Sequence, residues 1–196
     1  MRRIVFFDFD GTITRKDSLL QFITFTHGKL SLILWLLKSI PHIVLYYIGA
    51  YPNWKLKRDM LAFFYKGKNE QDLIFEGESF WRKKGQSDIK GSALNQIKMH
   101  KENGEKVVVV SASLNYWLAP FCEEYGLELI CTRLETEQGV ITGNYLTPNC
   151  YGIEKVNRIT TIYDLKEYDQ VVAYGDSRGD KEMLDLAHQA HYKYFK

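Results

Sequence analysis

The sequence predicts an α/β fold: a parallel sheet with helices on both faces and a block of helices inserted after the first strand. Apolar runs rich in β-branched residues recur at residues 3–9, 106–113, 127–132 and 170–177. Such continuous runs are typical of strands buried on both faces. Helical patterns separate the later runs, and strands that alternate with helices pair in parallel through right-handed crossovers. We therefore expect a Rossmann-like three-layer α/β core with a parallel sheet and an inserted all-helical cap.

The inserted helices begin directly after the first strand. Asp17 or Ser18 can cap the first helix, because a side-chain oxygen there accepts hydrogen bonds from the free N–H groups of the first turn. Pro41 then divides an apolar region into two short helices. The expected division is a core of residues 1–14 and 89–196 and a helical cap of residues 15–88.

Short sequence motifs also predict where helices end and strands turn in the second half of the chain. Asn103-Gly104 suits the end of a helix that starts near residue 89, and Gln138-Gly139 suits the turn of a small hairpin. Further elements are expected as helices at 114–126, 154–165 and 179–188 and as a last strand at 191–195.

Composition limits the classes of function. With 196 residues, 45% of them hydrophobic, the chain can bury one good core. The net charge of +2 gives no general reason to expect nucleic acid as a partner. Three widely spaced cysteines indicate reduced thiols, and Asp8 and Asp10 interrupt the first apolar run too early for an export signal. The expected location is the cytoplasm, either free or on the cytoplasmic face of a membrane.

Polar residues follow the apolar runs at the places where a parallel sheet opens its ligand crevice. Several carboxylates gathered there repel one another, and a hard divalent cation such as Mg²⁺ relieves that repulsion. In chain order these residues are Asp8, Asp10, Ser111, Lys155, Asp176 and Asp180.

Four motifs in this order resemble those of the haloacid dehalogenase-like hydrolases. They are DFDGT at 8–12, SAS at 111–113, Lys155 within GIEKV, and GDSRGD at 175–180. The position of the helical insertion is similar to that of the first-type cap of subfamily IB, which includes phosphoserine phosphatase. The apolar stretch after the first motif and the GIEKV context look most like the phosphatidylglycerophosphatase C branch.

The resemblance implies a Mg²⁺-dependent phosphomonoester phosphatase with an aspartyl-phosphate intermediate. Asp8 would be the nucleophile and Asp10 the general acid and base. Asp8, the Asp10 carbonyl and Asp176 would bind Mg²⁺, with Asp180 supporting them. Ser111 and Lys155 would bind the substrate phosphate.

Two assignments have alternatives. Ser111 could cap the helix near residue 114 instead of binding phosphate, but Ser113 competes for that place, so we assign Ser111 to phosphate and Ser113 to a structural role. Asp17 could cap the first inserted helix, or it could contact the substrate, as the acid at this offset does in phosphoserine phosphatases.

Residues 30–51, LSLILWLLKSIPHIVLYYIGAY, are apolar enough to raise the question of a membrane. A single span would separate Asp8 from its partners, and each arm of a hairpin at Pro41 is too short to cross. Peripheral contact with an anionic lipid surface and burial inside the cap are the two remaining interpretations. The first is favoured by the flanking basic residues Lys29, Lys38, Lys55, Lys57 and Arg58. The substrate is accordingly expected to be a lipid phosphate such as phosphatidylglycerol phosphate, with a small metabolite such as phosphoserine as the alternative. A catalytically silent lipid- or partner-binding protein is a further alternative.

Overall fold

A five-stranded sheet forms the centre of the molecule. The computed structural model describes residues 1–196 and orders the strands β3-β2-β1-β6-β7, each parallel to its neighbours. The order confirms the predicted α/β fold. The strands are β1 Arg3–Phe7, β2 Lys106–Leu114, β3 Glu128–Thr132, β6 Gln170–Gly175 and β7 Gln189–Tyr192.

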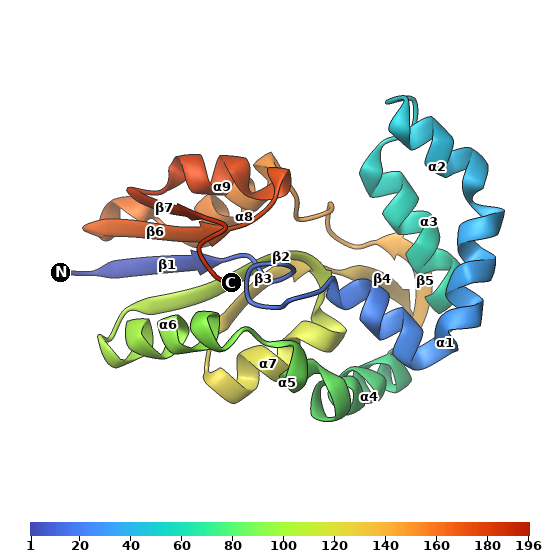
Figure 1. The fold of residues 1–196 in the computed structure, drawn as a ribbon, viewed down its shortest axis with the longest axis horizontal. Coiled ribbons are helices and arrows are strands. Elements are labelled where there is room, and N and C mark those ends of the chain that lie inside the picture. The colour runs from blue at the N-terminus through green and yellow to red at the C-terminus, as the bar shows by residue number, and fades with distance from the viewer.

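Both faces of the sheet are buried, which explains the apolar runs. Val5 and Phe7 of β1 belong to one hydrophobic cluster, and Ile4 and Phe6 belong to a second, because successive side chains point to opposite faces. Helices cover both faces (Figure 1). On the first face lie α6 Gly91–Glu102 and α7 Asn115–Tyr125, and on the second lie α8 Ile153–Ile162 and α9 Lys181–Leu186.

Helices make up the segment between β1 and α6. They are α1 Ser18–Lys38, α2 Ile40–Tyr47, α3 Asn53–Tyr65, α4 Glu70–Phe80, a π-helical turn Trp81–Gly85 and the short α5 Gln86–Asp88. Helix α1 is kinked at Gly28, whose φ of 80° is not helical. The predicted division of the apolar region is confirmed: the chain breaks at Ser39, and Pro41 lies in the first turn of α2.

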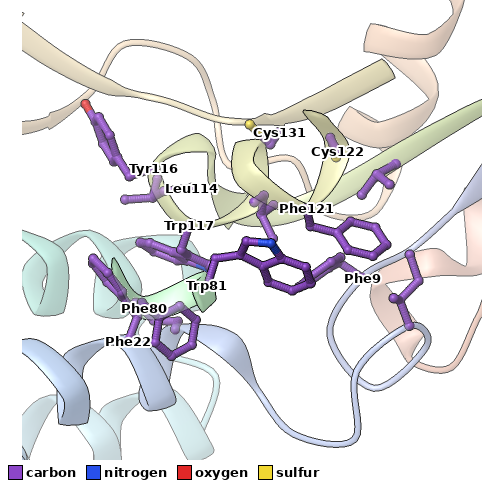
Figure 2. Packing of buried hydrophobic residues seen from close by; sticks show 14 of the residues in the cluster. Phe9, Phe22, Phe80, Trp81, Leu114, Tyr116, Trp117, Phe121, Cys122 and Cys131 are labelled. Carbon is purple, nitrogen blue, oxygen red and sulfur yellow. The ribbon is translucent and has the colours of Figure 1, made fainter. Parts of the chain in front are cut away.

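Aromatic side chains pack the helical segment against α7, one of the helices that cover the sheet (Figure 2). Phe22 of α1 stacks on Trp117 of α7 with ring centroids 4.7 Å apart, and Trp81 meets Phe121 edge to face at 5.4 Å. Phe9, from the loop after β1, contacts Phe121 at 5.3 Å. Helices α1 and α4 are therefore anchored by the same buried cluster that covers one face of the sheet.

The predicted hairpin is present as β4 Leu134–Glu137 and β5 Val140–Tyr145, and it turns at Gln138-Gly139. It packs against α3 and the turn that follows α3. The Gly67 amide donates to the Ile141 carbonyl at 2.8 Å, and the Ile141 amide donates to the Lys68 carbonyl at 2.9 Å. The loop that leaves β5 consequently starts beside the helical segment.

Several predicted boundaries were wrong. The first strand ends at Phe7 instead of residue 9, because Phe9 accepts hydrogen bonds from Ile13 and Thr14 in a tight turn. The last strand is Gln189–Tyr192 instead of 191–195; a positive φ at Lys193 ends it, and Phe195 returns to the core. Helix 154–165 ends at Ile162, and helix 179–188 is a 3₁₀ turn followed by α9.

Candidate active site

The loops after β1 and β6 meet at the carboxyl edge of the sheet. Asp8 is buried directly after β1, and its amide donates to the Tyr174 carbonyl at 2.9 Å. Gly11 then turns the chain with a φ of +85°, and a Cβ at this residue would lie 2.3 Å from Asp176 Oδ2. Only glycine permits this approach, so the sequence Asp-Gly-Thr has a steric reason.

Lys155, at the start of α8, lies between two buried carboxylates. Its Nζ donates to Asp8 Oδ1 at 2.6 Å, to Asp180 Oδ1 at 2.6 Å and to the Val110 carbonyl at 2.7 Å. Burial alone would lower the pKa of Lys155, but Asp8 and Asp180 outweigh burial and raise it. The lysine is therefore charged and fixed in place by all three of its donated hydrogen bonds.

Asp8, Asp176 and Asp180 form an acidic cluster in which one carboxylate oxygen of each lies within 4.8 Å of the others. Thr12 Oγ1 lies between two of them, 3.2 Å from Asp8 and 3.1 Å from Asp176. Burial raises the pKa of Asp8 to about 7, despite the charge of Lys155, and it raises the pKa of Asp176 as well. Carboxylates forced together in this way suit a hard divalent cation with oxygen ligands, such as Mg²⁺.

Asp180 is positioned differently from the other two acids. Its Oδ2 accepts hydrogen bonds from the Asp176 amide at 3.2 Å and from the Ser177 hydroxyl at 2.8 Å. Burial would raise the pKa of Asp180, but Lys155 and Ser177 outweigh it and lower the pKa. These contacts fit a residue that orients its neighbours.

Asp10 is held by hydrogen bonds from two sides. Its Oδ1 accepts from the Ser18 amide at 2.6 Å, and its Oδ2 accepts from the Ser113 hydroxyl at 2.5 Å. Burial and the neighbouring charge of Asp17 raise the pKa of Asp10, which favours a protonated carboxyl. The geometry suits a proton donor with a fixed orientation.

The role of Ser113 differs from the prediction. No side chain caps α7, because β2 continues to Leu114 and directs Ser113 toward Asp10 instead. Ser111 does not cap α7 either; its hydroxyl accepts from the Ser113 amide at 3.0 Å, and its side chain is buried at the site. Asp17 does cap α1, since its Oδ1 accepts from the Leu20 amide at 3.0 Å.

The predicted polar residues, with the exception of Asp176, line one cavity of about 330 Å³. Asp17 also lines it, so the capping bond and a contact with substrate are compatible. The wall of the cavity consists of Asp8, Asp10, Asp17, Ser111, Lys155 and Asp180 together with Leu19, Leu20, Asn53, Leu56, Lys57, Met60, Ala112, Asn149, Tyr151 and Ser177.

Lys57 of α3 is the functional candidate that the sequence did not reveal. We expected it to be one of several basic residues beside the apolar stretch, but its Nζ turns toward the cavity and donates to the Ala112 carbonyl at 2.9 Å. Burial lowers the pKa of Lys57, although Asp10 and Asp17 oppose that effect. Nothing in the local sequence distinguishes Lys57 from Lys55 or Arg58, because its partner lies 55 residues away.

A second hollow, a groove of about 610 Å³, continues from this cavity. The two share Asn53, Asn149 and Tyr151. The remaining wall of the groove is formed by Trp54, Tyr145, Leu146 and Pro148.

Known proteins are similar to this chain in sequence or in fold. A family model described as haloacid dehalogenase-like hydrolase matches residues 5–185. Protein CicA of Caulobacter vibrioides is 31% identical over 198 residues, which cover 98% of this chain and 86% of that protein. A protein of unknown function from Bordetella pertussis Tohama I has a TM-score of 0.83 at 21% identity, covering 95% of this chain and 87% of that one. A substrate-bound phosphoserine phosphatase has a TM-score of 0.69 at 17% identity, covering 98% and 86%.

The chain belongs to the haloacid dehalogenase-like hydrolases. It is a hydrolase of this family, and its fold is the one seen in phosphoserine phosphatase.

Proposed function

We propose that this hydrolase is a phosphomonoester phosphatase in which Asp8 is the nucleophile. The observation that carries the proposal is the place of Asp8: its carboxylate is bound by Lys155, and Asp10 lies two residues away in the same cavity. The likeness to a phosphoserine phosphatase supports the same class of reaction. In this scheme residues 15–88 act as a cap over a core of residues 1–14 and 89–196.

The reaction has two displacements. A carboxylate oxygen of Asp8 attacks phosphorus, the bond from phosphorus to the ester oxygen breaks, and the leaving alkoxide takes the proton of Asp10. Asp10 then removes a proton from water, the water oxygen attacks phosphorus, and the bond to Asp8 breaks to release inorganic phosphate. Ser111 donates a hydrogen bond to a phosphoryl oxygen, and the positive charge of Lys155 stabilises the phosphoryl group as negative charge redistributes in each step.

The acidic cluster fits Mg²⁺ as the cofactor. Asp8, the Asp10 carbonyl and Asp176 would hold the ion, and Asp180 would support them through its hydrogen bonds to Lys155 and Ser177. When bound, the ion neutralises negative charge on the phosphate and on the clustered carboxylates.

For the substrate we propose a lipid phosphate of the phosphatidylglycerol phosphate type, met at the cytoplasmic face of a membrane. Support comes from the segment 30–51, in which only Trp35 and Ser39 are buried. Tyr47 is 80% exposed and Ile48 is 70% exposed. The interpretation of this segment as buried cap core is therefore wrong, and an exposed apolar surface of this size indicates a binding partner.

Charge supports a lipid partner. No acidic residue occurs between Asp17 and Asp59, and the basic residues in that interval that do not line the cavity are Lys29, Lys38, Lys55 and Arg58. A basic, apolar surface suits peripheral contact with anionic lipids. Helix α1 is long and apolar enough to cross a membrane, but Phe22 and Ile23 in its first half are buried in the molecule.

Phosphate release from a panel of substrates tests the proposal. The panel contains phosphatidylglycerol phosphate, phosphoserine and a sugar phosphate, each with Mg²⁺ or with a chelator, and Asp8→Asn serves as the inactive control. We expect release that requires Mg²⁺ and Asp8 and is fastest with the lipid. Preference for phosphoserine would give the specificity to Asp17, and lipid binding without any turnover would indicate the silent alternative.

A further inference from the structure

The groove beside the catalytic cavity has a different chemical character from the cavity. Four of its seven wall residues are Trp54, Tyr145, Leu146 and Pro148, and none of the seven carries a charge. The cavity, by contrast, contains the acidic residues and two lysines. A ligand that fills both must therefore be charged at one end and uncharged at the other.

Two separate parts of the chain build the groove, residues 53–54 and residues 145–151, and they contact each other. Trp54 lies at the start of α3 and Tyr145 at the end of β5, where the tyrosine hydroxyl is 3.5 Å from the Trp54 carbonyl. Gly143 permits β5 to approach α3, since a Cβ at this residue would lie 3.0 Å from Ala62 Cβ. The shape of the groove thus depends on the docking of the hairpin against α3.

Tyr151 connects the groove to the catalytic loop. A Cβ at Gly179, within the GDSRGD motif, would lie 2.3 Å from a ring carbon of Tyr151, so the ring lies directly against the backbone of that loop. Tyr151 lines both hollows, and Asn53 and Asn149 lie with it where the two meet. A substrate with its phosphate at Asp8 can therefore continue into the groove without leaving the protein surface.

We propose that this groove binds an alkyl or acyl chain of the leaving group, so that the substrates are phosphomonoesters of alcohols that carry such a chain. The inference rests on the proposed phosphatase function and adds a recognition site to it. A volume of about 610 Å³ falls within the range of about 300–1,000 Å³ that is usual for small-ligand pockets. The chain gains affinity because burial removes its methylene groups from water.

A series of water-soluble n-alkyl phosphates of increasing chain length tests the proposal, with glycerol 1-phosphate as the substrate that lacks a chain. We expect kcat/KM to rise with each methylene by a factor of up to about fourfold, the limit for full burial. Leu146→Ser and Trp54→Ala should abolish most of this rise, so that kcat/KM becomes nearly independent of chain length. Ile162→Ser is the matched control, because Ile162 is as exposed as Leu146 but lines neither hollow.

Binding provides a second measurement that needs no turnover. Calorimetry of Asp8→Asn should show octyl phosphate bound more tightly than inorganic phosphate, with the difference lost when Leu146→Ser is added. Equal kcat/KM for all chain lengths in an active enzyme would overturn the groove assignment and leave the phosphatase proposal intact. Absence of Asp8-dependent hydrolysis of every ester would instead overturn the phosphatase proposal.

Discussion

The ammonium group of Lys155 lies 2.6 Å from Asp8 Oδ1, although 147 residues separate the two in the sequence. Both side chains are buried, and a second ion pair joins the same lysine to Asp180. The pairs place the proposed nucleophile at a fixed point of the sheet edge and join β1, α8 and the loop after β6. Without the lysine both carboxylates would be buried with no counter-charge. Its contribution to folding can therefore be measured by unfolding, separately from catalysis.

Lys155→Met should destabilise the fold, since it leaves Asp8 and Asp180 buried without a counter-charge. The expected loss in the free energy of unfolding is about 3–5 kcal/mol, the usual cost of breaking a buried pair. Urea unfolding in the presence of a chelator measures it. Lys181→Met removes only the exposed pair with Asp185 and should change little. Equal stability of both variants would show that the buried pairs contribute nothing to folding.

Gly11→Ala should weaken the binding of Mg²⁺ and so raise the concentration of Mg²⁺ that the reaction requires. The new methyl group would collide with Asp176 Oδ2 and displace a proposed metal ligand, so the Mg²⁺ concentration for half-maximal phosphate release should rise about tenfold. Gly49→Ala is a matched control: Gly49 also has a positive φ, of +78°, but no atom lies within 4 Å of its added Cβ. A normal Mg²⁺ requirement in Gly11→Ala would contradict a metal role for Asp176.

Ser113→Ala should impair proton transfer by Asp10. The variant loses the hydrogen bond to Asp10 Oδ2 but leaves Asp8 and Lys155 in place. The kcat/KM of alkyl phosphates, which covers only the first displacement and the protonation of the leaving group, should fall about tenfold, a part of the 10²–10⁴ that general acid–base catalysis supplies. Nitrophenyl phosphate, which has a good leaving group, should be affected far less. An equal loss for both esters would indicate a structural defect and not a defect in acid catalysis.

Substitutions in the exposed segment 30–51 should alter membrane binding and not chemistry. Tyr47→Asp and Ile48→Asp place a negative charge on an exposed apolar surface, so both should reduce cosedimentation with vesicles that contain phosphatidylglycerol. Hydrolysis of glycerol 1-phosphate should stay at the level of the parent. Ile162→Asp, on α8, is the control for adding a charge elsewhere. Failure of the parent to bind these vesicles would remove the membrane proposal.

Short-range sequence patterns were sufficient to predict the parallel sheet and the residues that lie at its carboxyl edge. The apolar runs before Asp8 and Asp176 predicted buried parallel strands, and the residues after such strands lie at one edge because the strands are parallel. Pro41 and Gln138-Gly139 likewise predicted a helix break and a hairpin turn from short-range sterics.

Contacts between distant segments could not be predicted in this way. Ser113 binds Asp10 across 103 residues, and Lys57 reaches the cavity only because α3 folds over the end of β2. The docking of the hairpin on α3 depends on close backbone approach at Gly143, for which the sequence shows only a glycine. The exposure of residues 30–51 also depends on tertiary packing, because an apolar pattern is equally typical of a buried helix.

The most direct test of the central claim is to trap the covalent intermediate. The enzyme is mixed with a rapidly hydrolysed phosphomonoester and Mg²⁺, quenched in acid during turnover, digested and mapped by mass spectrometry. We predict a phosphoryl group on the peptide that contains Asp8, and none in Asp8→Asn. Undiminished hydrolysis by Asp8→Asn, or a phosphoryl group on another residue of the active parent, would contradict the assignment of Asp8 as the nucleophile.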